Sequence, residues 1–98
     1  MLPIKVTSSA VLQIEEAASW WSDNRPAAPL ALRDDLQQAF TLISEQPNIG
    51  AAATNAALPG VRRIHLGRIR YFLYYRIRPD QVEILALWHA SRGQEPSL

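Results

Sequence analysis

The sequence predicts one α+β domain, residues 1–98, with the element order β-α-α-β-β-β and a helical hairpin packed on one face of a mostly antiparallel sheet. Two stretches in the first half of the chain carry apolar residues at helical spacing. Three short apolar stretches in the second half are separated by turn residues. A chain of 98 residues has the length of a single domain with one modest core.

Composition narrows the class of protein. Apolar residues make up 48% of the chain and charged residues 19%, which is typical of a globular protein rather than a disordered one. The chain has no cysteine and no residues at the spacing of a metal site or a phosphate-binding glycine loop, so we expect no cofactor and no metal. It also lacks a secretory leader and an apolar run of about 18 residues, so we expect a cytoplasmic protein with no membrane contact.

The first strand and the first helix are expected at the start of the chain. Residues 3–7 are rich in β-branched side chains and alternate in polarity, which predicts a strand. Ser8 and Ser9 follow as candidate N-caps of a helix. The apolar stripe of this helix recurs at helical spacing: Val11, Ile14, Ala17, Ala18 and Trp21. The sequence Asp-Asn-Arg-Pro at residues 23–26 is expected to end it.

A second helix is expected to begin between Pro26 and Pro29, because proline is tolerated in a first helical turn. Its apolar stripe is Leu32, Leu36, Ala39, Phe40 and Ile43. Residues 46–50, Gln-Pro-Asn-Ile-Gly, end this helix, so the two helices should form an antiparallel hairpin. The small, uncharged residues 50–60 predict a mobile loop, in which a helical turn would fit.

Three strands are predicted in the second half of the chain, at residues 61–66, 69–78 and 81–89. Gly67-Arg68 and Pro79-Asp80 lie where tight turns belong, so sequential antiparallel pairing is the simplest arrangement. The last of these strands is almost continuously apolar, which is typical of a strand covered on both faces. The cover opposite the helices is expected from the loop at 50–60, the tail at 93–98 or a partner chain.

The two faces of the middle strand differ in chemistry, because side chains alternate across a strand. One face is expected under the helices: Ile69, Tyr71, Leu73, Tyr75 and Ile77. The other face interleaves arginines with aromatic residues: Arg70, Phe72, Tyr74, Arg76 and Arg78. We interpret it as an open contact surface, because exposed aromatic side chains commonly mark one. The alternative is that the aromatic rings shelter under arginine stems or under the C-terminal tail.

Charge is distributed unevenly, although the net charge is only +1. Residues 1–60 carry three cations and six anions, a sum of −3, whereas residues 61–98 carry seven cations and three anions, a sum of +4. All seven of the latter cations are arginines, whose planar guanidinium suits carboxylates and phosphates. The basic half is therefore either a solvated face or a docking surface for an acidic partner or nucleic acid.

Candidate catalytic residues are few. His89 can transfer protons near neutral pH, and Arg92 and Arg70 could stabilise a developing negative charge. His89 can equally orient its neighbours by hydrogen bonding, and His65 is expected to serve packing or the surface. No carboxylate occurs between Glu45 and Asp80, so the first two strands of the second half offer no general base.

Several motifs, in their order along the chain, resemble toxins of the ParE/RelE superfamily. The second helix opens with Ala-Pro-Leu-Ala-Leu-Arg-Asp-Asp-Leu (28–36) and closes with Gln-Pro-Asn-Ile-Gly (46–50). Further resemblances are Gly-Val-Arg-Arg (60–63), Tyr-Arg-Ile (75–77), Val-Glu-Ile-Leu (82–85) and a closing His-Ala-Ser-Arg (89–92). The resemblance covers about residues 3–93.

The resemblance implies the toxin of a type II toxin–antitoxin module. Its partner would be a cognate antitoxin with an acidic or amphipathic segment, in a toxin–antitoxin hetero-oligomer. ParE-like members inhibit DNA gyrase, whereas RelE-like members cleave mRNA on the ribosome. Phe72 stands where the nucleases carry an arginine, and their catalytic glutamate has no counterpart, although Arg70 could reach a similar place.

We therefore expect a gyrase-binding toxin that is neutralised by its antitoxin. The alternatives are a ribosome-dependent mRNA endoribonuclease and a non-toxic homologue that only binds the antitoxin. The catalytic candidates are His89, Arg92 and Arg70. The residues expected to bind the partner or target are Arg62, Arg63, Arg70, Phe72, Tyr74, Arg76, Arg78 and Trp88.

Overall fold

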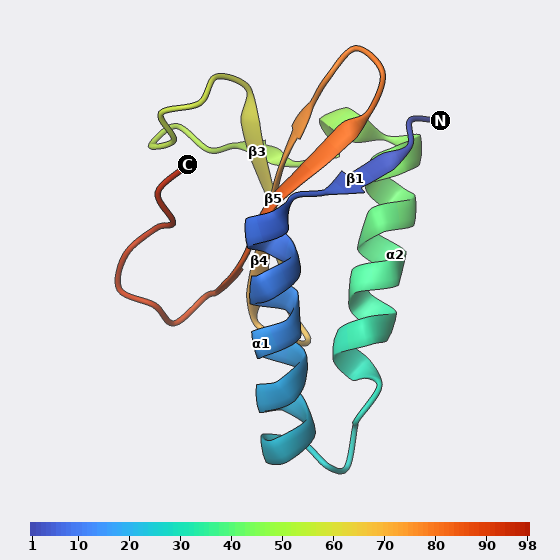
Figure 1. Ribbon diagram of the computed structural model, residues 1–98, viewed down its shortest axis with the longest axis vertical. Coiled ribbons are helices and arrows are strands. Elements are labelled where there is room, and N and C mark those ends of the chain that lie inside the picture. Colours follow the sequence, from blue (N-terminus) through green and yellow to red (C-terminus); the bar gives the residue numbers. More distant parts are fainter.

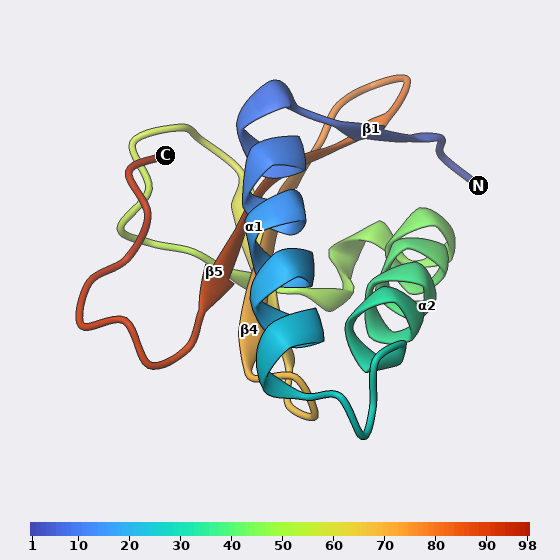
Figure 2. The ribbon, with the colours of Figure 1, turned by 60° about the horizontal axis from the view of Figure 1, so that its bottom comes forward.

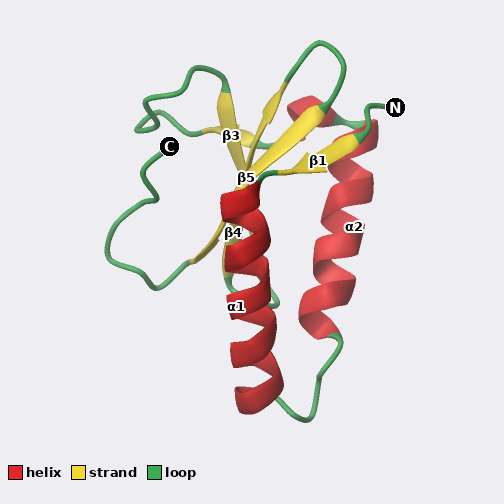
Figure 3. Cartoon of the chain, viewed as in Figure 1, coloured by secondary structure: helices red, strands yellow, loops and turns green.

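Two antiparallel helices pack on one face of a five-stranded sheet in the structure, a computed structural model that describes residues 1–98 (Figures 1 and 3). The strands are β1 (Ile4–Val6), β2 (Ala51–Ala52), β3 (Val61–Leu66), β4 (Tyr71–Ile77) and β5 (Val82–His89). The helices are α1 (Ser8–Asn24), α2 (Ala31–Glu45) and a single 3₁₀ turn, η1 (Pro47–Ile49). The strand order is β1-β5-β4-β3-β2, and every pair is antiparallel except β1 with β5. The α+β fold class and the helical hairpin are confirmed.

Helix α1 is capped by Thr7 and not by Ser8 or Ser9 as expected. Thr7 keeps an extended backbone, its N–H donates to Ile84 O of β5, and its Oγ1 accepts from the N–H of Ala10 at 3.3 Å. The residue that closes the parallel β1–β5 pairing therefore also starts the helix.

The buried stripe of α1 is Ala10, Ala17 and Trp21, so the expectation that Val11 and Ala18 are buried was wrong. A polar contact fixes which side of α1 faces the sheet. Leu87 N, in the part of β5 that β1 does not pair with, donates to Gln13 Oε1 at 2.9 Å. At the other end, Trp21 Nε1 donates to Ala28 O at 2.7 Å and fixes the connection to α2.

Helix α2 begins at Ala31, later than the expected start between Pro26 and Pro29, because residues 26–30 form turns. Its stripe is confirmed, with Phe40 half-buried and the other four members buried. Arg68 in the β3–β4 turn holds this helix through a two-pronged contact with Asp35, at 2.6 and 3.1 Å. Neither α1 nor α2 is both long and apolar enough to cross a membrane.

Strand β2 was missed, because two alanines carry no alternation that could predict it. Ala51 and Ala52 pair with Arg63 and Arg62 of β3. Their position is set from outside the segment: Gly50 N donates to the Tyr75 hydroxyl at 2.8 Å, and that hydroxyl donates to Pro47 O at 2.7 Å. The rest of the predicted loop up to residue 60 contains no further strand or helix.

Strand β4 starts at Tyr71, two residues later than expected, because residues 67–70 form the turn. Arg70 has a left-handed backbone with φ 63°, so it lies in the turn and not in the row of strand side chains. The face predicted under the helices is confirmed at Tyr71, Leu73 and Tyr75, which belong to the main core with Ile69. Ile77, expected on the same face, is exposed at the end of β4.

The expected cover on both faces of β5 is confirmed. On the helix side, Val82, Ile84 and Leu87 join the main core. On the far side, a second cluster combines Val61, Tyr74, Leu85 and Ala86 with partly buried residues of the 53–60 loop and the tail: Ala53, Ala56 and Leu98, together with Phe72 and Trp88. Figures 1 and 2 show this loop and the C-terminal tail side by side, away from α2. The cover is therefore supplied by the chain itself.

Candidate functional site

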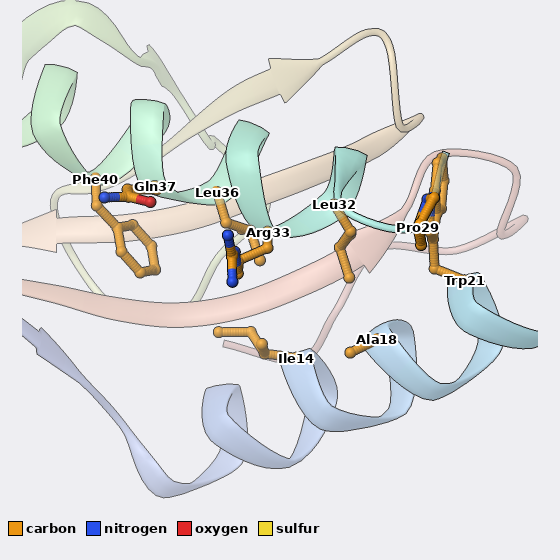
Figure 4. Close-up of a pocket in the computed structure, with 9 residues that line it drawn as sticks. All are labelled: Ile14, Ala18, Trp21, Pro29, Leu32, Arg33, Leu36, Gln37 and Phe40. Carbon is orange, nitrogen blue, oxygen red and sulfur yellow. The ribbon is translucent and has the colours of Figure 1, made fainter. Parts of the chain in front are cut away.

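A groove of about 390 Å³ lies between α1 and α2 and is open to solvent (Figure 4). Its α1 wall carries Ile14, Ala18 and Trp21, and its α2 wall carries Leu32, Leu36 and Phe40 at every fourth position. Pro29, Arg33 and Gln37 complete the lining. We call this feature the hairpin groove. Trp21, Leu32 and Leu36 are buried at the base of the groove, whereas Ile14 and Phe40 are half-buried and Ala18 is exposed.

The hairpin groove has the chemistry of a site for an amphipathic segment. Apolar walls between two helices accept aliphatic or aromatic side chains spaced along a helix or an extended segment. Arg33 adds a cation: its side chain is 72% exposed, and its one carboxylate neighbour, Asp34, lies 4.0 Å away. At that separation and exposure the pair contributes little, so the guanidinium is available to an acidic ligand.

A second candidate surface lies on the side of the sheet away from the helices. Four of the predicted partner-binding residues meet there, and we call them the arginine–aromatic face: Arg63, Phe72, Tyr74 and Trp88. The Arg63 guanidinium lies 4.3 Å from the ring centre of Phe72, and Trp88 pairs with Phe72 across β4 and β5. The Arg92 guanidinium lies over the half-buried ring of Trp88, 4.0 Å from its centre. The structure thus brings together four of the eight residues expected to bind a partner or target, and their binding role stays a prediction.

The expected exposure of this face was wrong at Tyr74, which is only 2% exposed. The loop and the tail lie over it, and Phe72 is half-buried. Hence the alternative interpretation applies, in which arginine stems and the C-terminal tail shelter the aromatic rings. An open surface at this place would require the tail to move.

The other predicted partner-binding arginines do not join this face. Arg62 Nη1 donates to Gly50 O at 2.7 Å and to Asn48 O at 3.3 Å, so it holds the segment before β2. Arg76 forms an ion pair with Glu83 at 2.6 Å. Arg78 is exposed in the β4–β5 turn, and Arg70 is exposed in the β3–β4 turn. The basic half of the sequence is therefore divided among several places on the molecule.

The catalytic candidates meet only in part. His89 and Arg92 line a cavity of about 500 Å³ against α1, and Arg70 does not. The other lining residues are Gln13, Glu16, Ala17, Trp20, Tyr71, Leu87 and Ser91. Sequence reasoning missed Glu16, because it sought a carboxylate only near the strands. The 3-4 spacing of Gln13, Glu16 and Trp20 on α1 was the available signal.

Hydrogen bonds orient the imidazole in this cavity. His89 Nδ1 accepts from the backbone N–H of Ser91 at 3.2 Å and contacts the Ser91 hydroxyl, which leaves Nε2 as the protonated nitrogen of the neutral ring. Burial raises the pKa of Tyr71, a shift that the positive charge of Arg92 opposes, so this phenol stays protonated at neutral pH. The cavity thus presents positioned donors and one carboxylate, and no hydrogen bond joins Glu16 to His89.

The Arg76–Glu83 pair predicts a pH dependence of stability. The hydrogen bond from Arg76, with the positive charges of Arg76, Arg78 and Lys5, holds the pKa of Glu83 below its ordinary value of 4.5 against the opposing effect of burial. A lowered folded-state pKa adds stability above the unfolded-state pKa, and this stability is lost as the pH falls through the folded-state pKa. The free energy of unfolding should therefore fall more steeply between about pH 5 and pH 3 in the parent than in Glu83→Gln.

Urea denaturation at pH 7, 4 and 3 measures this difference. The matched control is Glu15→Gln, which neutralises an exposed carboxylate on α1 and forms no ion pair. Glu15→Gln should follow the parent over the whole range. Superimposable pH profiles for the parent and Glu83→Gln would contradict a contribution from the pair.

Comparison with known proteins adds to this geometry. The family model described as the ParE toxin of the type II toxin-antitoxin system, parDE, matches residues 4–93. No curated protein matches the sequence. A solved structure described as the chromosomal ParDE toxin–antitoxin system from P. aeruginosa is similar with a TM-score of 0.75 and 21% sequence identity. The match covers 93% of this chain and 98% of that chain. At this identity the likeness shows the shared fold.

Proposed function

This chain belongs to the family of ParE toxins of type II toxin–antitoxin systems, and we propose that it arrests growth by binding DNA gyrase and is neutralised by a cognate antitoxin seated in the hairpin groove. The observation that supports antitoxin binding is the hairpin groove itself. It is apolar, open and about 390 Å³ in volume, with the exposed cation of Arg33 at its side, paired only at 4.0 Å with Asp34. An antitoxin segment with apolar side chains at helical spacing and a carboxylate facing Arg33 fits this chemistry.

Family membership and the internal contacts of two arginine residues support gyrase as the target. Arg62 and Arg76, expected to contact a target, are engaged in internal contacts, and Phe72 occupies the position at which the nuclease branch carries an arginine. Binding a protein target needs no general acid–base pair. Toxicity by binding therefore agrees better with these residues than RNA cleavage does.

A supercoiling assay with purified gyrase tests the target. We expect the chain to inhibit supercoiling and the inhibition to disappear after incubation with the product of the neighbouring antitoxin gene. Unchanged supercoiling at a large excess of toxin would reject gyrase as the target. Tight antitoxin binding without growth arrest on induction would instead identify a homologue that has lost toxicity.

The cavity at His89 favours one second candidate, a ribosome-dependent mRNA endoribonuclease. It brings His89, Arg92 and Glu16 to one place, which are side-chain types suited to proton transfer and to a negatively charged phosphorane. Primer extension on translated mRNA discriminates the two functions. Codon-linked cuts that disappear in His89→Ala would establish the nuclease, and growth arrest without such cuts would exclude it.

A further inference from the structure

We propose that residues 93–98, the tail, are a displaceable occupant of the arginine–aromatic face, and that this face binds in their place an extended acidic peptide of another protein. The peptide would carry a carboxylate three residues before an aliphatic side chain. This surface lies on the opposite side of the sheet from the hairpin groove. The proposal therefore does not rest on the site suggested for the antitoxin.

The tail is bound to the face as a peptide ligand would be, through three groups of polar contacts. The Glu95 carboxylate meets Arg63 Nη1 at 3.4 Å and accepts from Asn55 Nδ2 at 2.7 Å. The carbonyl of Gln94 accepts from Trp88 Nε1 at 2.8 Å. The backbone oxygen of Leu98 accepts from the N–H groups of residues 57 and 58, at 2.7 and 3.2 Å. These contacts satisfy donors that belong to the sheet, to its aromatic cluster and to the neighbouring loop.

Leu98 is the apolar anchor of the tail. Its side chain packs against the cluster built on Tyr74, Leu85 and Ala86, beside a recess that Leu58 and Trp88 also line. The first turns of α1 border this recess through Ser9 and Gln13, and α2 lies on the other side of the molecule (Figure 2). If the tail left, the cluster would be exposed as an aromatic and aliphatic patch bordered by Arg63, which is the composition of a protein-binding surface.

The contacts of the tail are of a kind that a competitor can replace. Residues 91–95 are exposed, the tail forms neither helix nor strand, and the Arg63–Glu95 ion pair joins two partly exposed side chains. Such pairs contribute little to stability. The tail stays in place largely because it is tethered, which gives it an effective concentration on the order of millimolar. A peptide with the same two anchors and a few more contacts would displace it.

The tail also indicates the chemistry of its competitor. Pro96 lies between the two anchors, Glu95 and Leu98, and favours an extended backbone there. The carboxylate is received by Arg63 next to the amide of Asn55, and the aliphatic side chain enters an apolar recess. A nucleic acid could supply the negative charge but has no group that matches the aliphatic anchor. An acidic peptide matches both.

A binding experiment on the full chain tests the proposal. The probe is a fluorescein-labelled peptide of sequence Gly-Gln-Glu-Pro-Ser-Leu, which repeats residues 93–98 and is supplied in trans. The loosened chain is the double variant Glu95→Gln with Leu98→Ala, and the matched control is Ser97→Ala, an exposed tail residue. We expect the double variant to bind the peptide at least about 10-fold more tightly than the parent, since the internal competitor is weakened. Ser97→Ala should bind it as the parent does.

Hydrogen exchange verifies that the tail alone has been released. The amides of residues 57 and 58, which donate to Leu98, should exchange faster in the double variant, while protection in α1, α2 and β4 is retained. Adding Arg63→Glu should abolish peptide binding. Equal affinity for parent and double variant, or no binding to either, would overturn the proposal. Preferential binding of a single-stranded oligonucleotide over the peptide would overturn the choice of partner.

Discussion

Gly50→Ala is expected to destabilise the protein by about 2–3 kcal/mol, although the substitution adds a single methyl group. A Cβ at this position would lie 2.5 Å from the Tyr75 hydroxyl oxygen, 2.8 Å from Cε1 of the same ring and 3.0 Å from Arg63 O. The ring cannot move aside, because Tyr75 is fully buried and its hydroxyl is bonded to both Gly50 N and Pro47 O. Backbone strain plays no part, since φ at Gly50 is −71°.

A double-mutant cycle separates the steric clash from other effects. Tyr75→Phe alone should cost about 1–3 kcal/mol, because it leaves Gly50 N and Pro47 O without their partner. It also removes the atom nearest to the new Cβ. The loss of unfolding free energy in the double variant, measured by urea denaturation, should therefore be about 1 kcal/mol smaller than the sum of the losses in the two single variants.

Gly93→Ala is the matched control for this cycle, because a Cβ there meets no atom within 4 Å. Its free energy of unfolding should lie within about 0.5 kcal/mol of the parent. If Gly50→Ala were no more destabilising than Gly93→Ala, the contact between Gly50 and Tyr75 would not be an essential link between α2 and the sheet.

The parts of the fold that were predictable from the sequence are those in which a local pattern decides the structure. Periodicity alone located both helices, the three long strands and the helix-facing side of β4. Strand β2, the cap at Thr7 and the late start of β4 were not predictable in this way. Each depends on a contact with a distant part of the chain: Gly50 with Tyr75, Thr7 with Ile84, and the carbonyl of Arg70 with Ala90 N.

The candidate surfaces were harder to predict than the fold, because the relevant property is whether a side chain is covered. Helical periodicity predicts Ile14, Leu32 and Leu36 as core residues. The local sequence does not show that α1 and α2 leave a groove between the two helices. Conversely, Tyr74 reads as exposed because alternation places it opposite the helices, yet the tail covers it. Alternation assigns a residue to a face of the sheet, whereas tertiary contacts decide whether that face is open.

Ala18→Glu is expected to weaken antitoxin binding about 100-fold, or about 2.7 kcal/mol, if the antitoxin occupies the hairpin groove. Ala18 is exposed on α1 and lines the groove between Ile14 and Trp21, so the new carboxylate would face the apolar side chains of α2. A bound segment would have to bury this charge among apolar side chains, and an acidic segment would also be repelled by it and would compete with it for Arg33. Glutamate is a good helix former and the site is exposed, so the fold should change in stability by less than about 1 kcal/mol.

Ser19→Glu is the matched control, since it adds the same charge at the next, exposed position of α1 and does not line the groove. Titration calorimetry with the purified product of the neighbouring antitoxin gene compares the two. An equal loss of affinity in both variants would indicate long-range repulsion and would exclude the groove as the docking site. In cells, Ala18→Glu should still arrest growth but should no longer be rescued by the antitoxin if the proposed groove serves neutralisation alone.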